Sequence, residues 1–162
     1  MASRRSWTPL VPLRRAYRIA DRRHQIFNGQ GAATFGGRWN SPGRHVIDAS
    51  ETYAGAMLEV LANSNIGRMP KHHAWIEILI AEDVSVEEVD PSQVRRWDAS
   101  DQRASRIFGD GWYDEKRSTL LIVPSAVVRA ERNVVINQVH PGFRKLRATK
   151  PKPVVWDQRL FR

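Results

Sequence analysis

The chain has 162 residues, of which 41% are hydrophobic and 27% are charged, which predicts one globular domain able to bury a core of its own. It contains no cysteine, so disulfide scaffolds, thiolate nucleophiles and cysteine zinc sites are excluded. No apolar run approaches the roughly 20 residues of a membrane helix. The Arg-rich N-terminus lacks the apolar core of a secretory signal, and we therefore expect a cytoplasmic protein.

Charge is distributed unevenly along the chain. There are 26 Lys and Arg residues against 17 Asp and Glu residues, which gives a net charge of +9. The basic excess lies in residues 1–45 and 119–162, whereas residues 46–118 are net acidic. A protein that only coats nucleic acid does not usually carry an acidic middle third, so this pattern favours an anionic ligand or an acidic partner surface.

The first elements follow an N-terminal arm. Residues 1–14 are rich in Arg and contain two prolines, which is typical of an arm outside the main domain of residues 15–162. In chain order we then expect a strand over Ala16–Ala20, a flexible glycine-rich loop over Asn28–Gly37, a turn over 41–43 and a strand over His45–Ser50.

A helix is expected from Ser50, its N-cap, to about Ser64. Its apolar residues recur at the spacing of one helical face, which predicts a buried stripe of Ala54, Met57, Leu58 and Leu61. Glu59 lies well away from that stripe around the helix.

The second half of the chain mixes strands and helices. In chain order we expect a strand over Trp75–Ala81, a helix over Asp98–Lys116, and strands over Thr119–Val123, Asn133–Gln138 and Val154–Trp156. Because strands and helices do not alternate regularly, the predicted fold class is α+β.

The most informative stretch for chemistry is GGRWNSPG, residues 36–43. Gly36 and Gly37 let the backbone pass close to a ligand. Arg38 can grip a pyrophosphate through two parallel hydrogen bonds, and Asn40 can add another. Dinucleotide-binding, phosphate-loop, zinc-protease and serine-hydrolase motifs are absent, and the five histidines lack ligand-like spacing, so no metal site is expected.

A different class of function is nucleic-acid binding without catalysis. Arg and Trp are neighbours at Arg38-Trp39 and at Arg95-Arg96-Trp97, where Trp can stack on bases while Arg contacts phosphates. No helix-turn-helix, zinc-finger or RNA-recognition signature accompanies them. This alternative predicts binding to DNA or RNA that weakens steeply with salt.

Six spaced motifs, in order, resemble the RES toxin domain. They are Tyr17-Arg18-Ile19, GGRWNSPG, Ala56–Leu61, Val123–Val127, Asn133–Asn137 with His140–Phe143, and Asp157–Phe161. The resemblance covers about residues 15–161. It implies a compact mixed-sheet variant of the ADP-ribosyltransferase fold, with NAD as substrate and no metal, acting as the toxin of a bacterial toxin–antitoxin pair. The implied partner is an antitoxin with an Xre-like DNA-binding region, in a hetero-oligomer, so the chain itself is expected to bind neither DNA nor a membrane.

The resemblance also implies the site residues. Arg38, Glu59 and Ser125 match the Arg, Glu and Ser that give the family its name, whereas Asn133 and Asn137 match positions near the pocket.

Four further residues belong to the implied NAD-binding set. Tyr17 and Arg18 lie in the first motif, and Asp48 stands where the family usually has a tyrosine that stacks on nicotinamide. An aspartate cannot supply an aromatic face, although it can favour a cationic nicotinamide ring. Tyr17 or Tyr53 can provide the missing aromatic surface.

The implied reaction explains why these side chains are needed. When nicotinamide leaves NAD, positive charge develops on the ribose, and a carboxylate such as that of Glu59 stabilises it. Arg38 would hold the diphosphate, and Ser125 would bond the nicotinamide or the ribose. With water or phosphate as acceptor the protein degrades NAD, and with a protein acceptor it is a mono-ADP-ribosyltransferase. An interaction protein that Asp48 has made inactive is a further interpretation.

Overall fold

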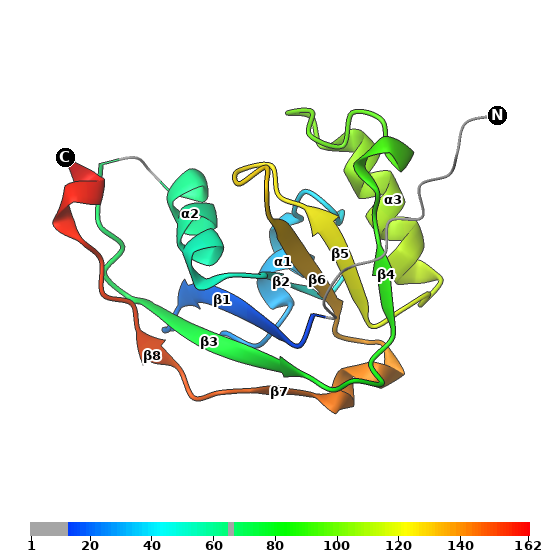
Figure 1. Ribbon diagram of the computed structural model, residues 1–162, viewed down its shortest axis with the longest axis horizontal. Coiled ribbons are helices and arrows are strands. Elements are labelled where there is room, and N and C mark those ends of the chain that lie inside the picture. Colours follow the sequence, from blue (N-terminus) through cyan, green and yellow to red (C-terminus); the bar gives the residue numbers. More distant parts are fainter. Residues whose placement is uncertain (1–12, 65–66) are drawn as a thin grey trace.

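The protein is described by a computed structural model that covers residues 13–64 and 67–162 (Figure 1). The expected N-terminal arm lies outside these residues except for its last two, Leu13 and Arg14. The carbonyl of Arg14 already accepts a hydrogen bond from the Ile80 amide (2.9 Å), so this residue extends the first strand of the sheet by one residue.

The α+β class is confirmed, because helices pack on an eight-stranded sheet that is mainly antiparallel. The strand order is β4-β5-β6-β2-β1-β3-β7, with β8 beside β3, and only β4 and β5 pair in parallel. The strands are β1 (Arg15–Asp21), β2 (Val46–Ser50), β3 (His73–Ile80), β4 (Val86–Glu88), β5 (Leu120–Pro124), β6 (Arg132–Asn137), β7 (Leu146–Ala148) and β8 (Lys152–Pro153). The α-helices are α1 (Gln30–Phe35), α2 (Tyr53–Asn63) and α3 (Arg103–Asp114), and short 3-10 turns occupy Pro91–Gln93, Pro141–Lys145 and Gln158–Phe161.

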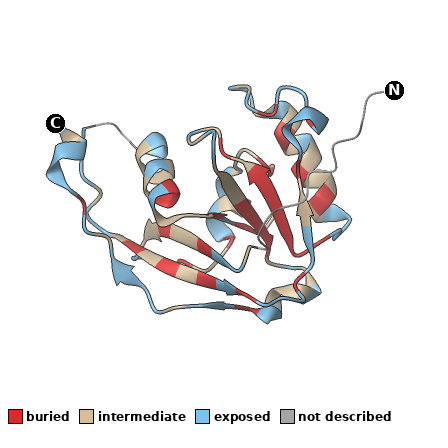
Figure 2. Cartoon of the chain, in the orientation of Figure 1, coloured by how far each residue is buried: buried red, intermediate tan, exposed pale blue. Residues whose placement is uncertain are grey.

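The strand pattern follows from burial. Strand β3 alternates buried and less buried residues, so one face packs on the core. The first four residues of β5 are all buried, because α3 and its neighbours cover one face of the strand and the main core covers the other (Figure 2). The core thus consists of two hydrophobic clusters, which meet along β5 and β6. Helix α2 lies over β1 and β2 on the other half of the sheet (Figure 1).

Helix α2 differs from the expectation in two ways. Its N-cap is Thr52, whose hydroxyl accepts a hydrogen bond from the Gly55 amide (2.9 Å), because Ser50 is still paired in β2. The predicted apolar stripe is wrong, since Ala54 and Leu58 are exposed and the helix buries Gly55 and Ala56. These small residues let the helix approach the sheet closely.

Other expected boundaries also shift. Residues 30–35 of the expected loop form α1, and the helix expected from Asp98 begins only at Arg103, because Gln102 has a left-handed backbone (φ 58°). The last predicted strand is wrong by two residues, since pairing with β3 involves Lys152 and Pro153. The short strands β4 and β7 had no sequence signal. Among the described residues, no helix is long and apolar enough to cross a membrane.

Candidate active site

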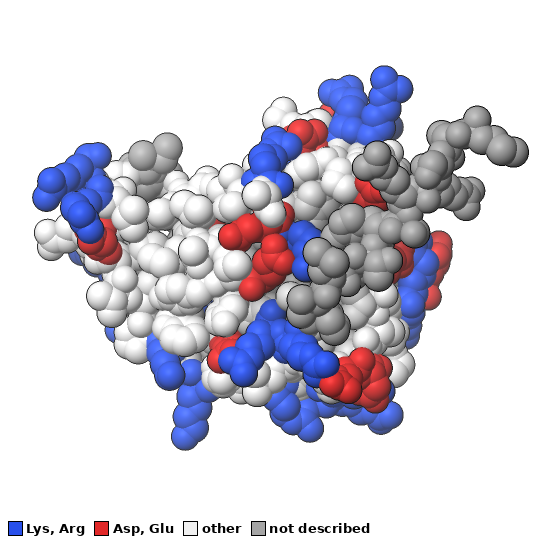
Figure 3. Space-filling view, viewed as in Figure 1, with Lys and Arg blue, Asp and Glu red and all other residues white. Residues whose placement is uncertain are grey.

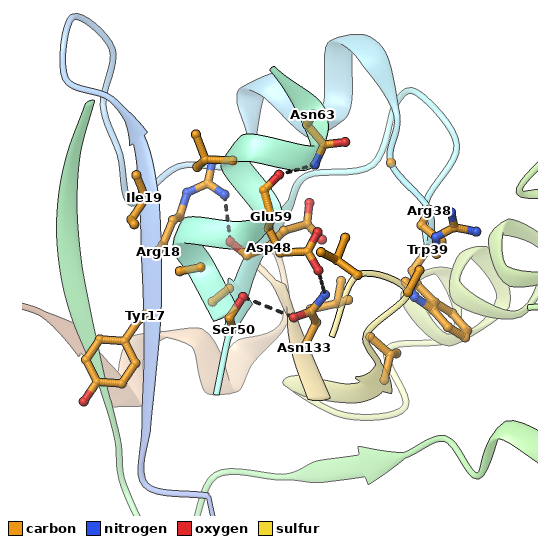
Figure 4. Close-up of a pocket in the computed structure, with 18 of the residues that line it drawn as sticks. Tyr17, Arg18, Ile19, Arg38, Trp39, Asp48, Ser50, Glu59, Asn63 and Asn133 are labelled. Carbon is orange, nitrogen blue, oxygen red and sulfur yellow. Dashed lines mark hydrogen bonds between the residues drawn. The ribbon is translucent and has the colours of Figure 1, made fainter. Parts of the chain in front are cut away.

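One cleft of about 580 Å³ is lined by residues of α2 and of five strands, together with residues of the segments that connect them. Helix α2 lies on one side and the loop of residues 36–39 on the other, with residues of β1, β2, β5 and β6 between them (Figure 4). Six of the predicted residues line this cleft: Tyr17, Arg18, Arg38, Asp48, Glu59 and Asn133.

The Glu59 carboxylate is fixed by two donors that converge on one oxygen. Its Oε1 accepts hydrogen bonds from the Ser125 hydroxyl (3.0 Å) and from the Asn133 Nδ2 (2.7 Å). The Asn133 Oδ1 in turn accepts from the Ser50 hydroxyl (3.1 Å) (Figure 4). Hydrogen bonds to a carboxylate are among the stronger ones, so this network orients Glu59 in the cleft.

The hairpin of β5 and β6 explains why these donors meet. Ser125 directly follows β5, and Val123 of β5 is paired with Asn133 of β6, so both donors lie at the same end of the hairpin. Ser125 is 2% exposed and its oxygen also accepts a hydrogen bond from the Val128 amide (2.9 Å), which directs the hydroxyl proton toward Glu59. Ser125 therefore contacts Glu59 from behind and does not line the cleft itself.

Arg38 lies at the end of the cleft that the loop of residues 36–39 forms. Its Nη1 donates to the carbonyls of Trp97 (3.2 Å) and Ala99 (3.0 Å), which leaves its Nε and Nη2 without a hydrogen bond among the described residues. Its own carbonyl accepts from the Ser105 hydroxyl of α3 (2.6 Å). The guanidinium is held in place and still has N–H groups for an anion.

Asn40 braces this loop from behind and lies outside the cleft lining. It is 1% exposed, and its Nδ2 donates to the carbonyls of Ala32 (3.0 Å) and Ser41 (3.3 Å). A Cβ at Gly37 would lie 2.9 Å from the Asn40 Oδ1, so the glycine is needed for this close approach. The structure thus gives Asn40 a supporting place, in contrast to the expected ligand contact.

Strand β1 supplies Arg18 and Tyr17. The Arg18 Nε donates to the Ile26 carbonyl (2.8 Å) and its Nη1 donates to the Asp48 carbonyl (2.7 Å). Burial lowers the pKa of Arg18 below its usual value, and the Asp48 carboxylate opposes this effect. Tyr17 lies at the cleft edge and points away from Glu59 (Figure 4).

Tyr53 packs beside the cleft without lining it. Its ring meets those of Tyr17 and Trp75 edge to face, with centroid separations of 6.3 and 5.1 Å. Burial raises the pKa of Tyr53 above its usual value. This aromatic cluster supports the β1 side of the cleft and places no ring beside Glu59.

Asp48 extends from β2 into the cleft. Its side chain is exposed to the cleft, between the buried residues Ile47 and Ala49 of the same strand. Desolvation in the cleft raises the pKa of Asp48, with a smaller contribution from the Glu59 carboxylate, while Arg18 acts in the opposite direction.

Asn137 lies at the far end of β6, outside the cleft. It is fully buried, its Nδ2 donates to the Tyr113 carbonyl (3.3 Å), and its Oδ1 accepts from the Val139 amide (3.1 Å). It lies four positions after Asn133 along the strand, a span of about 13 Å. Asn137 therefore joins the end of α3 to β6 and does not contribute to the cleft.

Several cleft residues were not expected from the sequence. Trp39 belongs to the GGRWNSPG motif and to an Arg-Trp pair, but the sequence assigns it no role of its own. No motif points to Ser50, Asn63, His73 or Gln102. Gln102 borders the cleft with a left-handed backbone, a conformation that no sequence pattern marks.

The arrangement combines an oriented carboxylate with two arginines in one cleft. No group of three or more His, Asp or Glu side chains that could hold a metal occurs among the described residues. The cleft suits an anionic ligand whose reacting carbon becomes positively charged.

Comparison with known proteins supports this description. The model of the RES domain matches residues 15–157. The chain belongs to the RES-domain family of toxins. It is 35% identical over 139 residues to the Prs ADP-ribosylating toxin of Sphingobium sp. (strain YBL2), a match that covers 83% of this chain and 86% of that protein. It is 31% identical over 149 residues to Toxin Res of Yersinia enterocolitica, covering 89% and 97% respectively.

A solved structure shares the fold of this RES-domain chain. It belongs to the MbcT–MbcA toxin–antitoxin complex of M. tuberculosis, with a TM-score of 0.70 and 21% sequence identity. The match covers 87% of this chain and 84% of that chain. At this level of identity the likeness establishes the fold.

Proposed function

We propose that this RES-domain chain is a toxin that binds NAD and cleaves its nicotinamide–ribose bond. The observation that carries the proposal is the Glu59 carboxylate, held by Ser125 and Asn133 in a cleft that Arg38 also lines. As the bond to nicotinamide breaks, its electron pair leaves with the ring nitrogen and positive charge grows on the ribose. A fixed carboxylate beside that carbon stabilises the charge without first having to reorient.

The other cleft residues bind the remainder of the substrate. Arg38 holds the diphosphate through its free N–H groups, which keeps the ribose beside Glu59 as the bond stretches. Ser125 and Asn133 act on the substrate through Glu59. Water or phosphate then adds to the ribose carbon, which gives hydrolysis or phosphorolysis.

Similarity to one named relative favours a protein as a second acceptor of the ADP-ribose group. The Sphingobium relative is named an ADP-ribosylating toxin, and the same cleavage with a protein nucleophile gives ADP-ribosylation. The solved complex supports a cognate antitoxin as partner, for which the sequence resemblance predicts an Xre-type DNA-binding region.

The experiment follows nicotinamide release from NAD by the purified chain, with and without phosphate. Glu59→Gln keeps the shape of the side chain and an oxygen that can accept the hydrogen bonds of Ser125 and Asn133, but it removes the negative charge. We expect it to lower kcat by about 10²–10³-fold, as loss of one preorganised electrostatic group does. Arg38→Ala should mainly raise KM. Glu115→Gln, an exposed glutamate at the end of α3, is the matched control and should retain full activity.

Absence of nicotinamide release by the native chain would contradict NAD cleavage. Full activity of Glu59→Gln would mean that the chain cleaves NAD but that the Glu59 carboxylate does not take part in catalysis. Labelled NAD, supplied with a bacterial lysate, distinguishes free products from label transferred to a protein.

A further inference from the structure

Asp48 is an acidic side chain in the cleft that the fold does not use. Its neighbours in β2, Ile47 and Ala49, are 0% and 5% exposed, whereas Asp48 extends into the cleft. Arg18 bonds the Asp48 backbone carbonyl, and no hydrogen bond or ion pair reaches the Asp48 carboxylate among the described residues. A carboxylate in this position gives the sheet no contact that a neutral side chain could not give.

The Asp48 carboxylate lies between Glu59 and the loop of residues 36–39. A Cβ at Gly37 would be 3.7 Å from the Asp48 Oδ2, so the glycine leaves a gap beside the carboxylate. Glu59 is close enough for its charge to act on Asp48, and Figure 4 draws both side chains in the same part of the cleft. The charge of Arg18 acts on Asp48 in the opposite direction to that of Glu59.

This placement has a consequence for NAD, and the following inference rests on the proposed function. If the ribose carbon faces Glu59, the nicotinamide nitrogen is one bond away and the ring reaches the neighbourhood of Asp48. That ring is positively charged in NAD and neutral in NADH, whereas the diphosphate, both riboses and the adenine are the same. We propose that Asp48 makes the cleft selective for the oxidised dinucleotide by pairing its carboxylate with the cationic ring.

The expected size of the preference follows from Coulomb's law. Two unit charges about 6 Å apart in a partly hydrated cleft, with an effective dielectric constant of about 40, attract strongly enough to change affinity about tenfold. Salt screens such a pair only in part, because the cleft walls exclude much of the solvent.

The test compares dissociation constants for NAD and NADH by calorimetry in the Glu59→Gln chain, in which cleavage is suppressed. We expect about tenfold tighter binding of NAD than of NADH. Adding Asp48→Asn should bring the two constants to within about twofold, chiefly by weakening NAD. Adding Asp48→Glu, which restores a carboxylate, should recover most of the preference.

The outcomes separate this inference from the proposed function. If neither dinucleotide binds to Glu59→Gln, the proposed function fails. If both bind equally to Glu59→Gln, or if the preference persists after Asp48→Asn, the cleft binds dinucleotides and Asp48 does not select between them. Thermal melting checks the fold of each variant, and Asp48→Ser replaces Asp48→Asn in the same comparison if the latter does not fold.

Discussion

At the residue scale, the two oxygens of Glu59 have different surroundings. Oε1 accepts hydrogen bonds from Ser125 and Asn133, whereas Oε2 has no hydrogen bond among the described residues. The family resemblance predicted Glu59 and Ser125 as separate site residues. Their direct contact depends on the pairing of β5 with β6, so it became visible only in the folded chain.

Asp48 should reduce the stability of the protein at neutral pH. Its pKa is raised above the usual 3.8, so the folded chain binds this proton more tightly than the unfolded chain does. Stability is then lost as the pH rises from about 4 toward the raised pKa. Asp48→Asn removes the charge, and we expect it to raise the melting temperature at pH 7.5, by an amount that solvent screening reduces because the side chain is exposed to the cleft.

The same variant provides its own control at low pH. Near pH 3 the Asp48 carboxyl of the native protein is largely protonated in both the folded and the unfolded chain, so the melting temperatures of the native chain and Asp48→Asn should converge. A native chain that melts above Asp48→Asn at pH 7.5 would contradict the assigned direction. The expected result would mean that Asp48 is kept at the expense of stability, as residues that serve a site often are.

At the element scale, α3 can approach the Arg38 loop because of one glycine. A Cβ at Gly109 would lie 1.8 Å from the Trp39 carbonyl oxygen, a backbone atom that cannot move without displacing Arg38. We expect Gly109→Ala to lower the free energy of unfolding by about 3 kcal/mol, since overpacked sites lose this much. Urea titration measures the change.

Gly111, two residues further along the same helix, is the matched control. A Cβ there would meet only the Arg117 Nη1 at 3.8 Å. Alanine is the better helix former by about 1 kcal/mol, so Gly111→Ala should be neutral or stabilising. Equal losses from the two substitutions would mean that helix propensity, and not contact with the loop, decides the cost.

Helix α2 illustrates which part of the fold the sequence could predict. The apolar spacing correctly indicated a helix, but it assigned Ala54 and Leu58 to the buried side, and both are exposed. The side toward the sheet carries Gly55, Ala56 and Glu59 because that side forms a wall of the cleft. Hydrophobic periodicity assumes that polar residues face solvent, so it fails where a polar side chain faces a site.

The strands show the opposite case. Five of the eight overlap the predicted ranges, because runs such as those of β3 and β5 are long and rich in β-branched or apolar residues. The three-residue strands β4 and β7 owe their conformation to pairing with distant partners, Leu120–Ile122 and Ile78–Ile80. Such short segments carry no periodicity of their own.

At the scale of the whole molecule, the cleft brings together residues from Tyr17 to Val135, so a bound ligand would link the two halves of the sheet. The basic C-terminal part of the chain lies elsewhere. Figure 3 shows Lys and Arg side chains along the lower edge, over β7 and β8, where the exposed residues are Arg144, Lys145, Arg147, Lys150 and Lys152. None of these five lines the cleft, so this positive charge does not face a ligand bound there.

Occupation of the cleft should therefore stabilise the entire fold. In Glu59→Gln, NAD at about 100 times its dissociation constant should add about 2.7 kcal/mol, or roughly 5 to 10 °C in melting temperature. Arg38→Ala in the same background should remove most of the shift at that concentration, because its contact with the diphosphate is lost. An undiminished shift would place the diphosphate away from Arg38.

The stacked indoles of Trp39 and Trp97 beside Arg38 make tryptophan fluorescence sensitive to ligand binding in the cleft. Trp39 lines the cleft and stacks on Trp97 with ring centroids 6.4 Å apart, while the Trp97 carbonyl holds the Arg38 guanidinium. An anion that binds the Arg38 guanidinium competes with the Trp97 carbonyl for its N–H groups, and it therefore changes the surroundings of the Trp97 indole. Intrinsic emission can therefore follow filling and emptying of the cleft in real time, without a label.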